Sequence, residues 1–270
     1  MTYCHLETLD LPANRGVTIR TMKPLCVNYY DMPLTGDSSI LVPVDVSVSE
    51  PPDRAILDLL KPVNVVVLGY YPVPQQTAPA HLKEDHEADA AARLDDIVTE
   101  FDSTGHEVEG VLVFTQDRQD TIDRIADQHD CDAVLVPGEI ETIERILVPL
   151  RGDVNLERIV SLVGNLVGAS DATVTLFHSV PDETDPSQGE FILRGAADRL
   201  SEEGVSRDRI EWKLSESGEP KAGILELAGD HDLIILGETE PSLRDRIIGT
   251  VLTPILDELE QPAIVVRDIE

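Results

Sequence analysis

Residues 39–45 read SILVPVD, and residues 145–151 repeat this stretch as RILVPLR. A second pair keeps the same order: residues 130–139, DCDAVLVPGE, return at 230–238 as DHDLIILGE, with Pro137 as the extra residue. The two matches start at offsets of 106 and 100 residues. Self-similarity that keeps its order and spacing indicates repeated structural units. The sequence therefore predicts two copies of one domain joined head to tail.

The second copy alternates short apolar runs with longer amphipathic segments. The apolar runs predict strands at 145–151, 172–180, 209–214, 232–236 and 263–266. The amphipathic segments predict helices at 155–168, 187–203, 220–228 and 243–260. Unbroken apolar strands between helices are typical of a parallel sheet covered on both faces. We therefore expect an α/β fold, a doubly wound sandwich.

The first copy follows the same plan but stops early. Its predicted strands are 40–45, 63–71, 110–115 and 133–136, and its clearest helices are 80–101 and 121–128. After Gly138 only five residues precede the next repeat, too few for a helix and a strand. We therefore expect a truncated first domain at 38–138 that lacks its last helix and strand. A linker at 139–143 would join it to a complete second domain at 144–270.

The start of the chain, residues 1–37, differs from the remaining sequence. Residues 1–31 hold three acids and three bases, so the whole net charge of −31 falls on the rest of the chain. This stretch shows no sustained helical or strand period. Met32 then opens a plausible natural start. Two interpretations remain: a start assigned too far upstream, or a disordered tail.

The charge balance is extreme, with 52 acids against 21 bases, of which only five are lysines. A surface of this sign repels phosphate backbones and anionic lipids, which argues against nucleic acid and membrane surfaces as partners. No apolar run approaches the ~18 residues of a membrane span, and no secretory core opens the chain, so we expect a cytoplasmic protein. Many acids with few lysines resemble proteins of extreme halophiles; the alternative is an ordinary acidic cytosolic protein.

These features together resemble a tandem universal stress protein. The resemblance rests on ILVP at each first strand, on the aspartate, apolar run and glycine at each fourth strand, and on the segments 237–250 and 261–267. It implies two Rossmann-like domains of the adenine-nucleotide-hydrolase-like fold. It also implies a phosphate-holding loop, Gly-x-x-Gly, nine residues, then Gly-Ser or Gly-Thr, after the fourth strand. In such proteins an acidic residue that ends the first strand helps to hold adenosine.

The second copy matches that loop only in part. Gly237 fits the first glycine, and Gly249 with Thr250 fits the last pair. Glu240 stands where the second glycine belongs, and the gap to Gly249 is eight residues. Like charges a few Å apart cost on the order of 1–4 kcal/mol, so acids here oppose phosphate binding, while Arg244 offsets part of that charge.

The acid that ends the first strand survives only in the first copy. Asp45 holds this position there, whereas Arg151 replaces it in the second copy. The first copy in turn has no phosphate loop, so neither half carries a full site. The candidate nucleotide-binding residues are therefore Asp45, Gly237, Arg244, Gly249 and Thr250, and ATP or another adenine nucleotide is the candidate ligand.

The chain shows no sequence motif for catalysis, such as G-x-S-x-G, a Ser-His-Asp arrangement or a complete P-loop. The aspartate pairs 130/132 and 230/232 read as caps and turns before strands, so no metal site is predicted. We therefore expect a non-catalytic stress-response or regulatory binding protein; a weak nucleotide hydrolase is disfavoured. The alternative is a regulatory module that acts in trans on an amino-acid or cation transporter, because such degenerate tandem domains resemble permease tails.

The resemblance also implies an oligomeric state. Stand-alone universal stress proteins pair through their fifth strands, and here only the second domain owns that strand, Ala263–Val266. We therefore expect a homodimer joined through the second domains at this strand. The alternative is a monomer in which the strand edge is covered.

Overall fold

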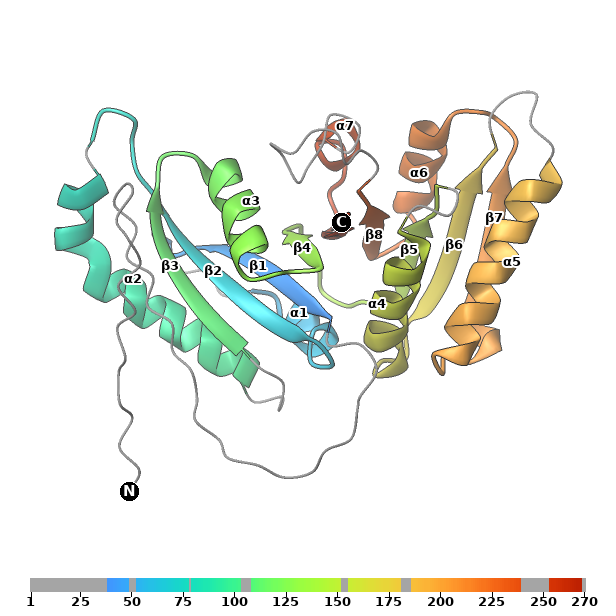
Figure 1. The fold of residues 1–270 in the computed structure, drawn as a ribbon, viewed down its shortest axis with the longest axis horizontal. Helices are drawn as coiled ribbons and strands as arrows, with labels where there is room; N and C mark the ends of the chain where they lie inside the picture. Colours follow the sequence, from blue (N-terminus) through green and yellow to red (C-terminus); the bar gives the residue numbers. More distant parts are fainter. Residues whose placement is uncertain are drawn as a thin grey trace, which may run out of the picture.

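The computed structural model describes residues 38–48, 52–77, 79–102, 108–151, 155–180, 186–238 and 253–268. Within these residues, nine strands form a single sheet in the order β3-β2-β1-β4-β9-β8-β5-β6-β7 (Figure 1). The fold class predicted from the sequence, α/β with helices on both faces of the sheet, is confirmed. The expected segments 1–37 and most of 243–260 lie outside the described residues.

The first half of the sheet is built as the apolar runs predict. Its strands are β1 (Ser39–Asp45), β2 (Asn64–Pro72), β3 (Val108–Thr115) and β4 (Ala133–Val136), all parallel to their neighbours in this half. Its helices are α1 (Arg54–Leu59), α2 (Pro79–Asp102) and α3 (Arg118–Gln128). Asp117 caps α3 by accepting a hydrogen bond from the backbone N–H of Asp120. Residues 137–144 form no helix or strand before β5.

The second half repeats this frame and adds one strand. Its strands are β5 (Arg145–Pro149), β6 (Thr173–Ser179), β7 (Ile210–Ser215), β8 (Leu233–Gly237) and β9 (Ala263–Val266). Its helices are α4 (Leu156–Gly168), α5 (Pro186–Glu202), α6 (Pro220–Ala228) and the short α7 (Thr253–Leu256), and a 3-10 turn at Arg207–Arg209 precedes β7. Within this half all paired strands are parallel.

The repeated aspartates tie the fourth strand of each half to the first. The carboxylate of Asp132 accepts from the backbone N–H of Ser39 at 2.9 Å, and that of Asp232 accepts from the N–H of Arg145 at 2.8 Å. The backbone N–H of each aspartate also donates to the carbonyl of the same residue, Ser39 or Arg145. Asp132 and Asp232 thus have a structural role directly before β4 and β8.

The two halves meet through β4 and β9, which run antiparallel. Because β8 pairs in parallel with β9, the two halves point in opposite directions along one continuous sheet. On the face covered by α1, α2, α4 and α5, one apolar core runs through both halves. On the other face, α3 covers one core and α6 with α7 covers another.

The expectation of a free edge at Ala263–Val266 was wrong. Its outer edge carries β4 of the same chain, with Ala133 opposite Val266 and Val136 opposite Ala263. A strand has only two hydrogen-bonding edges, and β8 occupies the other one. A homodimer joined through β9 therefore has no unpaired strand edge to use, and the first half completes the sheet that a second copy was expected to extend.

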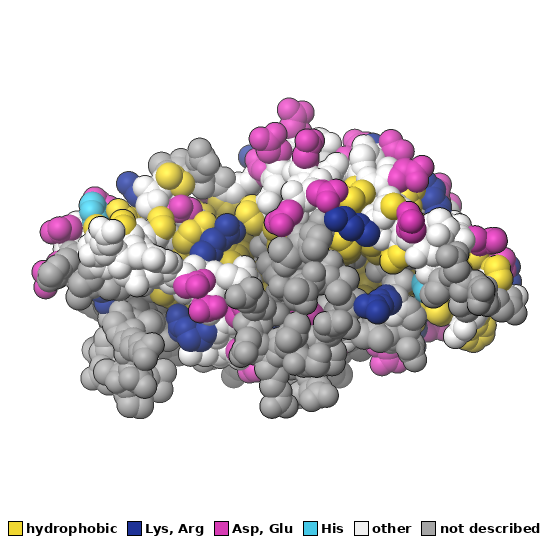
Figure 2. All heavy atoms as spheres, turned by 90° about the horizontal axis from the view of Figure 1, so that it is seen from above, with side chains coloured by type: hydrophobic (Ala, Val, Ile, Leu, Met, Phe, Trp, Pro, Cys, Tyr) yellow, Lys and Arg dark blue, Asp and Glu magenta, His cyan; other side chains and the backbone are white. Residues whose placement is uncertain are grey.

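The surface is strongly acidic, as the composition implies. Figure 2 shows Asp and Glu side chains spread over both halves, with Lys and Arg scattered among them. Within the described residues, no helix combines the length and the apolar character that a membrane crossing requires. Nor do three or more His, Cys, Asp or Glu side chains in those residues gather closely enough to hold a metal ion.

Candidate functional site

A cavity of about 280 Å³ lies at the carboxyl end of β1. It is lined by both β1 and β4 and by the segments directly after them in the chain. In the sheet, β2 and β3 lie on one side of β1, and β4 lies on the other side. The strand order of the first half therefore reverses between β1 and β4. In open α/β sheets, ligands bind outside the carboxyl ends of the strands at such a switch point.

Asp45 lines this cavity and is held in place by a local turn. Its Oδ1 accepts from the backbone N–H of Ser47 at 2.8 Å and from the Ser47 hydroxyl at 2.6 Å. Both of these bonds end on Oδ1. Among the described residues, Oδ2 is left to accept a hydrogen bond from a ligand. The turn thus fixes the direction of the carboxylate in advance.

The walls are apolar and rich in proline, and the charges are all negative. Asp45 and Asp53 are the acids, Tyr70 supplies a hydroxyl, and among the described residues no lysine or arginine lines the cavity. The remaining lining residues are Val42, Pro43, Val44, Val48, Pro52, Ile56, Leu135, Pro137, Gly138 and Pro262. Stiff walls with two carboxylates suit a ligand that has a flat apolar face and hydrogen-bond donors.

Tyr70 lies beside Asp45, since the two residues are register partners on β2 and β1. Burial raises the pKa of the Tyr70 hydroxyl; the guanidinium of Arg118 opposes this rise and Asp45 adds to it. The guanidinium carbon of Arg118 lies 5.1 Å from the centre of the Tyr70 ring. Tyr70 therefore keeps its proton at neutral pH and offers a donor next to the Asp45 acceptor.

The second half of the chain closes one side of the cavity. Pro262, directly before β9, belongs to the lining. Gly138 lies so close to this segment that a Cβ built on it would come within 2.4 Å of the backbone carbon of Gln261 and the nitrogen of Pro262. Only a residue without a side chain fits here. The cavity is thus a product of both halves, although its acids come from the first.

Of the predicted site residues that the structure describes, Asp45 and Gly237 do not lie at one site. Asp45 lies at this cavity, while Gly237 ends β8, separated from β1 by β4 and β9. The halves run in opposite directions. Along the strand direction, the carboxyl ends of β1 and β8 therefore lie at opposite ends of the sheet. Arg244, Gly249 and Thr250 lie outside the described residues.

Asp53, Tyr70 and Pro262 are among the cavity residues that sequence reasoning missed. Tyr70 could have been found, because it lies near the end of the strand predicted at 63–71, and in the structure it is the register partner of Asp45. Asp53 and Pro262 could not. Asp53 precedes a short helix with no motif around it, and Pro262 reaches the cavity only through the antiparallel pairing of β4 with β9.

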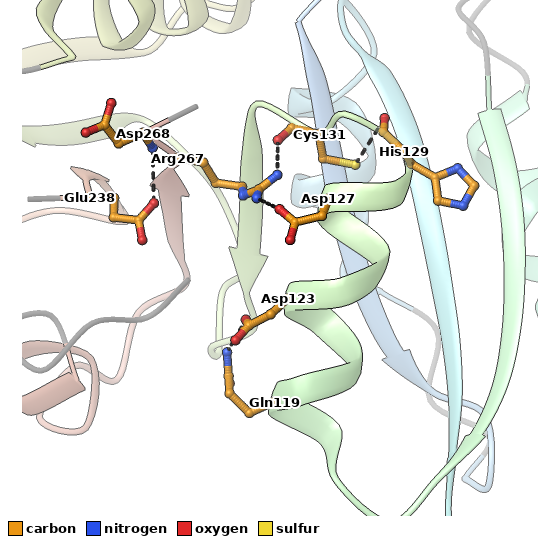
Figure 3. A network of polar contacts seen from close by, with 8 residues as sticks. All are labelled: Gln119, Asp123, Asp127, His129, Cys131, Glu238, Arg267 and Asp268. Carbon is orange, nitrogen blue, oxygen red and sulfur yellow. Dashed lines mark hydrogen bonds and ion pairs between the residues drawn. The ribbon is translucent and has the colours of Figure 1, made fainter. Parts of the chain in front are cut away.

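A polar network spans the junction of the halves, on the side of α3 (Figure 3). Arg267, which follows β9 and is 8% exposed, donates to the carbonyl of Cys131 at 2.9 Å and forms an ion pair with Asp127. Its backbone N–H donates to the carbonyl of Asp132. Three partners from the first half thus hold one buried arginine of the second, which fixes the β4–β9 junction.

Glu238 lies on the other side of this network. Its Oε2 accepts from the backbone N–H of Asp268 at 3.0 Å (Figure 3). Burial raises the pKa of the Glu238 carboxyl, and the nearby charges of Asp268 and Asp123 add to the rise, whereas the Asp268 N–H and Arg267 lower it. Burial and the neighbouring acids thus destabilise the charged form of this carboxylate.

The comparisons with known proteins agree with this architecture. Residues 142–267 match the universal stress protein family. No curated protein matches the chain in sequence. A universal stress protein from Archaeoglobus fulgidus DSM 4304 aligns with a TM-score of 0.56 at 16% identity, over 86% of this chain and 96% of that one. A Pseudomonas aeruginosa UCBPP-PA14 protein assigned to the same family aligns with a TM-score of 0.51 at 17% identity, over 84% and 92%.

The cytoplasmic domain of a prokaryotic cation chloride cotransporter also aligns, with a TM-score of 0.49 at 14% identity, over 86% of this chain and 96% of that one. At such identities a structural likeness shows the fold alone. The two alignments with TM-scores of 0.56 and 0.51 show a fold that is Rossmann-like, α/β and of the universal stress type. In sequence, the part of the chain that is similar to the universal stress protein family is residues 142–267.

Proposed function

We propose that the protein is a non-catalytic regulatory binding protein of the universal stress class that holds an adenine nucleoside in the cavity at the end of β1. One observation carries the proposal. Asp45, the acid that the family resemblance assigns to adenosine, lines a formed cavity at the switch point between β1 and β4. Its oriented carboxylate suits a pair of ribose hydroxyls, and the proline-rich walls suit a purine face.

The charges of the cavity favour a nucleoside over a nucleotide. Asp45 and Asp53 both line it, and no described basic residue does. A phosphate within a few Å of one carboxylate would lose on the order of 1–4 kcal/mol. Arg93 and Arg118 lie beside the cavity, on the Val46 and Ser47 carbonyls and over the Tyr70 ring, but neither lines it. ATP, a candidate ligand from the sequence, therefore fits this cavity less well than adenosine does.

Calorimetric titration of the full chain in molar KCl tests this proposal. Adenosine should bind, and ATP with Mg²⁺ should bind at least about tenfold more weakly because of the carboxylates. Asp45→Asn should weaken adenosine binding. Asp171→Asn, a matched change at an exposed position before β6, should leave it unchanged.

The outcomes separate three cases. If neither ligand releases heat, the cavity is structural and the proposal fails. If ATP binds more tightly than adenosine, the charge argument is wrong. If adenosine binds equally to the wild type and to Asp45→Asn, the ligand lies elsewhere. The regulatory role in trans on a transporter stays a prediction, and co-purification of a transporter with the tagged chain from its host would favour it.

A further inference from the structure

The outer edge of the second half is a strand with little cover. β7 ends the sheet, and among the described residues it pairs only with β6. Figure 1 shows it at one end of the sheet, beside α5. Three consecutive side chains, Glu211, Trp212 and Lys213, are exposed, and Trp212 is 39% exposed. An edge of this kind presents unpaired backbone N–H and C=O groups to any strand that can reach it.

The opposite end of the sheet is built differently. β3 is buried at Leu112, Val113 and Phe114, beneath α2 on one face and α3 on the other. Glu109 is its single charged residue. The exposure of β7 is therefore not a general property of the edges of this fold.

The two faces of β7 carry different chemistry. Side chains alternate along a strand, so Ile210, Trp212 and Leu214 share the face toward α5, whereas Glu211 and Lys213 share the other. On the α5 face, the guanidinium carbon of Arg194 lies 6.0 Å from the centre of the Trp212 ring. Phe191, one turn earlier on α5, is 78% exposed. Trp212 on β7 and Phe191 on the neighbouring helix are thus both exposed aromatic side chains.

We propose that β7 is the contact surface for a second copy of this chain, paired antiparallel about a two-fold axis at Trp212. In this register Glu211 faces Lys213 of the second copy, and Lys213 faces its Glu211. Ile210 faces Leu214 in both directions. The sequence IEWKL is therefore self-complementary in charge and in apolar contact, which a two-fold contact requires.

Charge favours this edge for self-association over the rest of the surface. The chain carries a net charge of −31, so most pairs of identical faces repel one another. At β7 the acid Glu211 meets a base, and Arg194 stands next to the axis. The two Trp212 rings would cover each other and the two Phe191 rings, which removes apolar surface from water.

Trp212 is also the only tryptophan of the chain, so its fluorescence reports this contact directly. We expect light scattering in molar KCl to give twice the 29.6 kDa mass of one chain, with a blue shift of the emission as concentration rises. Trp212→Glu, read by scattering alone, should abolish the dimer because it places two carboxylates at the axis. Lys61→Glu, a larger charge change at an exposed position near α1, should leave the dimer intact.

A charge swap tests the register. Lys213→Glu places acids opposite Glu211 and should weaken the dimer about tenfold. The double change Glu211→Lys with Lys213→Glu restores opposite charges across the axis and should recover the wild-type affinity. A wild-type chain that stays at the mass of one chain would overturn the proposal. So would a Lys213→Glu dimer as strong as the wild type, or a double variant as weak as the single one. Circular dichroism checks that each variant is folded.

Discussion

The two halves of the sheet share a frame but differ in the residues at the ends of their strands. Asp132 and Asp232 anchor the fourth strand to the first in the same way in both halves. The first strand of one half then ends in Asp45 at a cavity, while the equivalent position of the other is the exposed Arg151. The residue between the paired aspartates differs too: Cys131 in the first half, and in the second His231, which contacts the Leu227 carbonyl and the Thr175 hydroxyl.

This difference teaches that a duplicated fold keeps the contacts that hold strands together and changes those at strand ends. The first half lacks a fifth strand of its own, and β9 of the second half occupies the place beside β4. The halves therefore depend on each other for a complete sheet. Aligned residues of the two halves provide matched pairs of substitutions that test this dependence.

The largest effect is expected at the aligned glycines Gly138 and Gly237. Gly138→Ala should destabilise the protein by about 3 kcal/mol, because its new Cβ meets the backbone of residues 261 and 262, which cannot move without disturbing β9. Gly237→Ala should lose only about 1 kcal/mol, since its Cβ meets the terminal methyl of Ile159 at 2.8 Å. Denaturant unfolding in molar KCl measures both. Equal losses would show that the close contact at the junction is not a constraint.

The next effect is expected at the arginine of the junction. Arg267→Ala removes the donor to the buried Cys131 carbonyl and should reduce the free energy of unfolding by about 2 kcal/mol. The exposed pair of Arg207 with Asp198 provides the control, and Arg207→Ala should lose less than about 1 kcal/mol. The same unfolding assay compares them. A small loss for Arg267→Ala would mean that strand pairing and the shared apolar core hold the halves together without this arginine.

The smallest effect is expected at Glu238 and depends on pH. Its pKa is raised in the folded state, so the folded protein keeps the proton at a pH where the unfolded chain has lost it. This contribution to stability is present below the unfolded pKa and is lost as the pH rises through the folded pKa. Glu238→Gln should therefore raise the melting temperature at neutral pH. The gain should be well under about 1 kcal/mol, because water screens the half-exposed carboxylate, and it should vanish near the usual pKa of glutamate.

The aligned acid of the first half controls this experiment. Glu139 is exposed, and Glu139→Gln should change the melting temperature little at any pH. A gain at Glu238 that persists at low pH would assign the effect to packing rather than to ionisation.

Strand positions were predictable from the sequence to within about two residues, since apolar runs such as 133–136 and 263–266 coincide with β4 and β9. Helix α6 was predicted with the bounds that it has, helped by the proline at its first turn. Of the candidate site, Asp45 was predicted and lines the cavity. Tyr70, Asp53 and Pro262 were missed, because their contribution depends on which segments meet in space.

The sequence by itself determined the repeat, the α/β class and the strand that ends in Asp45, because a strand buried on both faces needs a local apolar run wherever it lies in the sheet. Only the tertiary structure decided that β9 pairs antiparallel with β4 and that β7 is left as an edge strand. It also decided that Asp45 and Gly237 lie at opposite ends of the sheet along the strand direction. The physical reason is that strand edges pair through backbone groups, which every residue type except proline offers alike. The choice of partner therefore depends on which edge comes within reach and leaves no pattern in the local sequence.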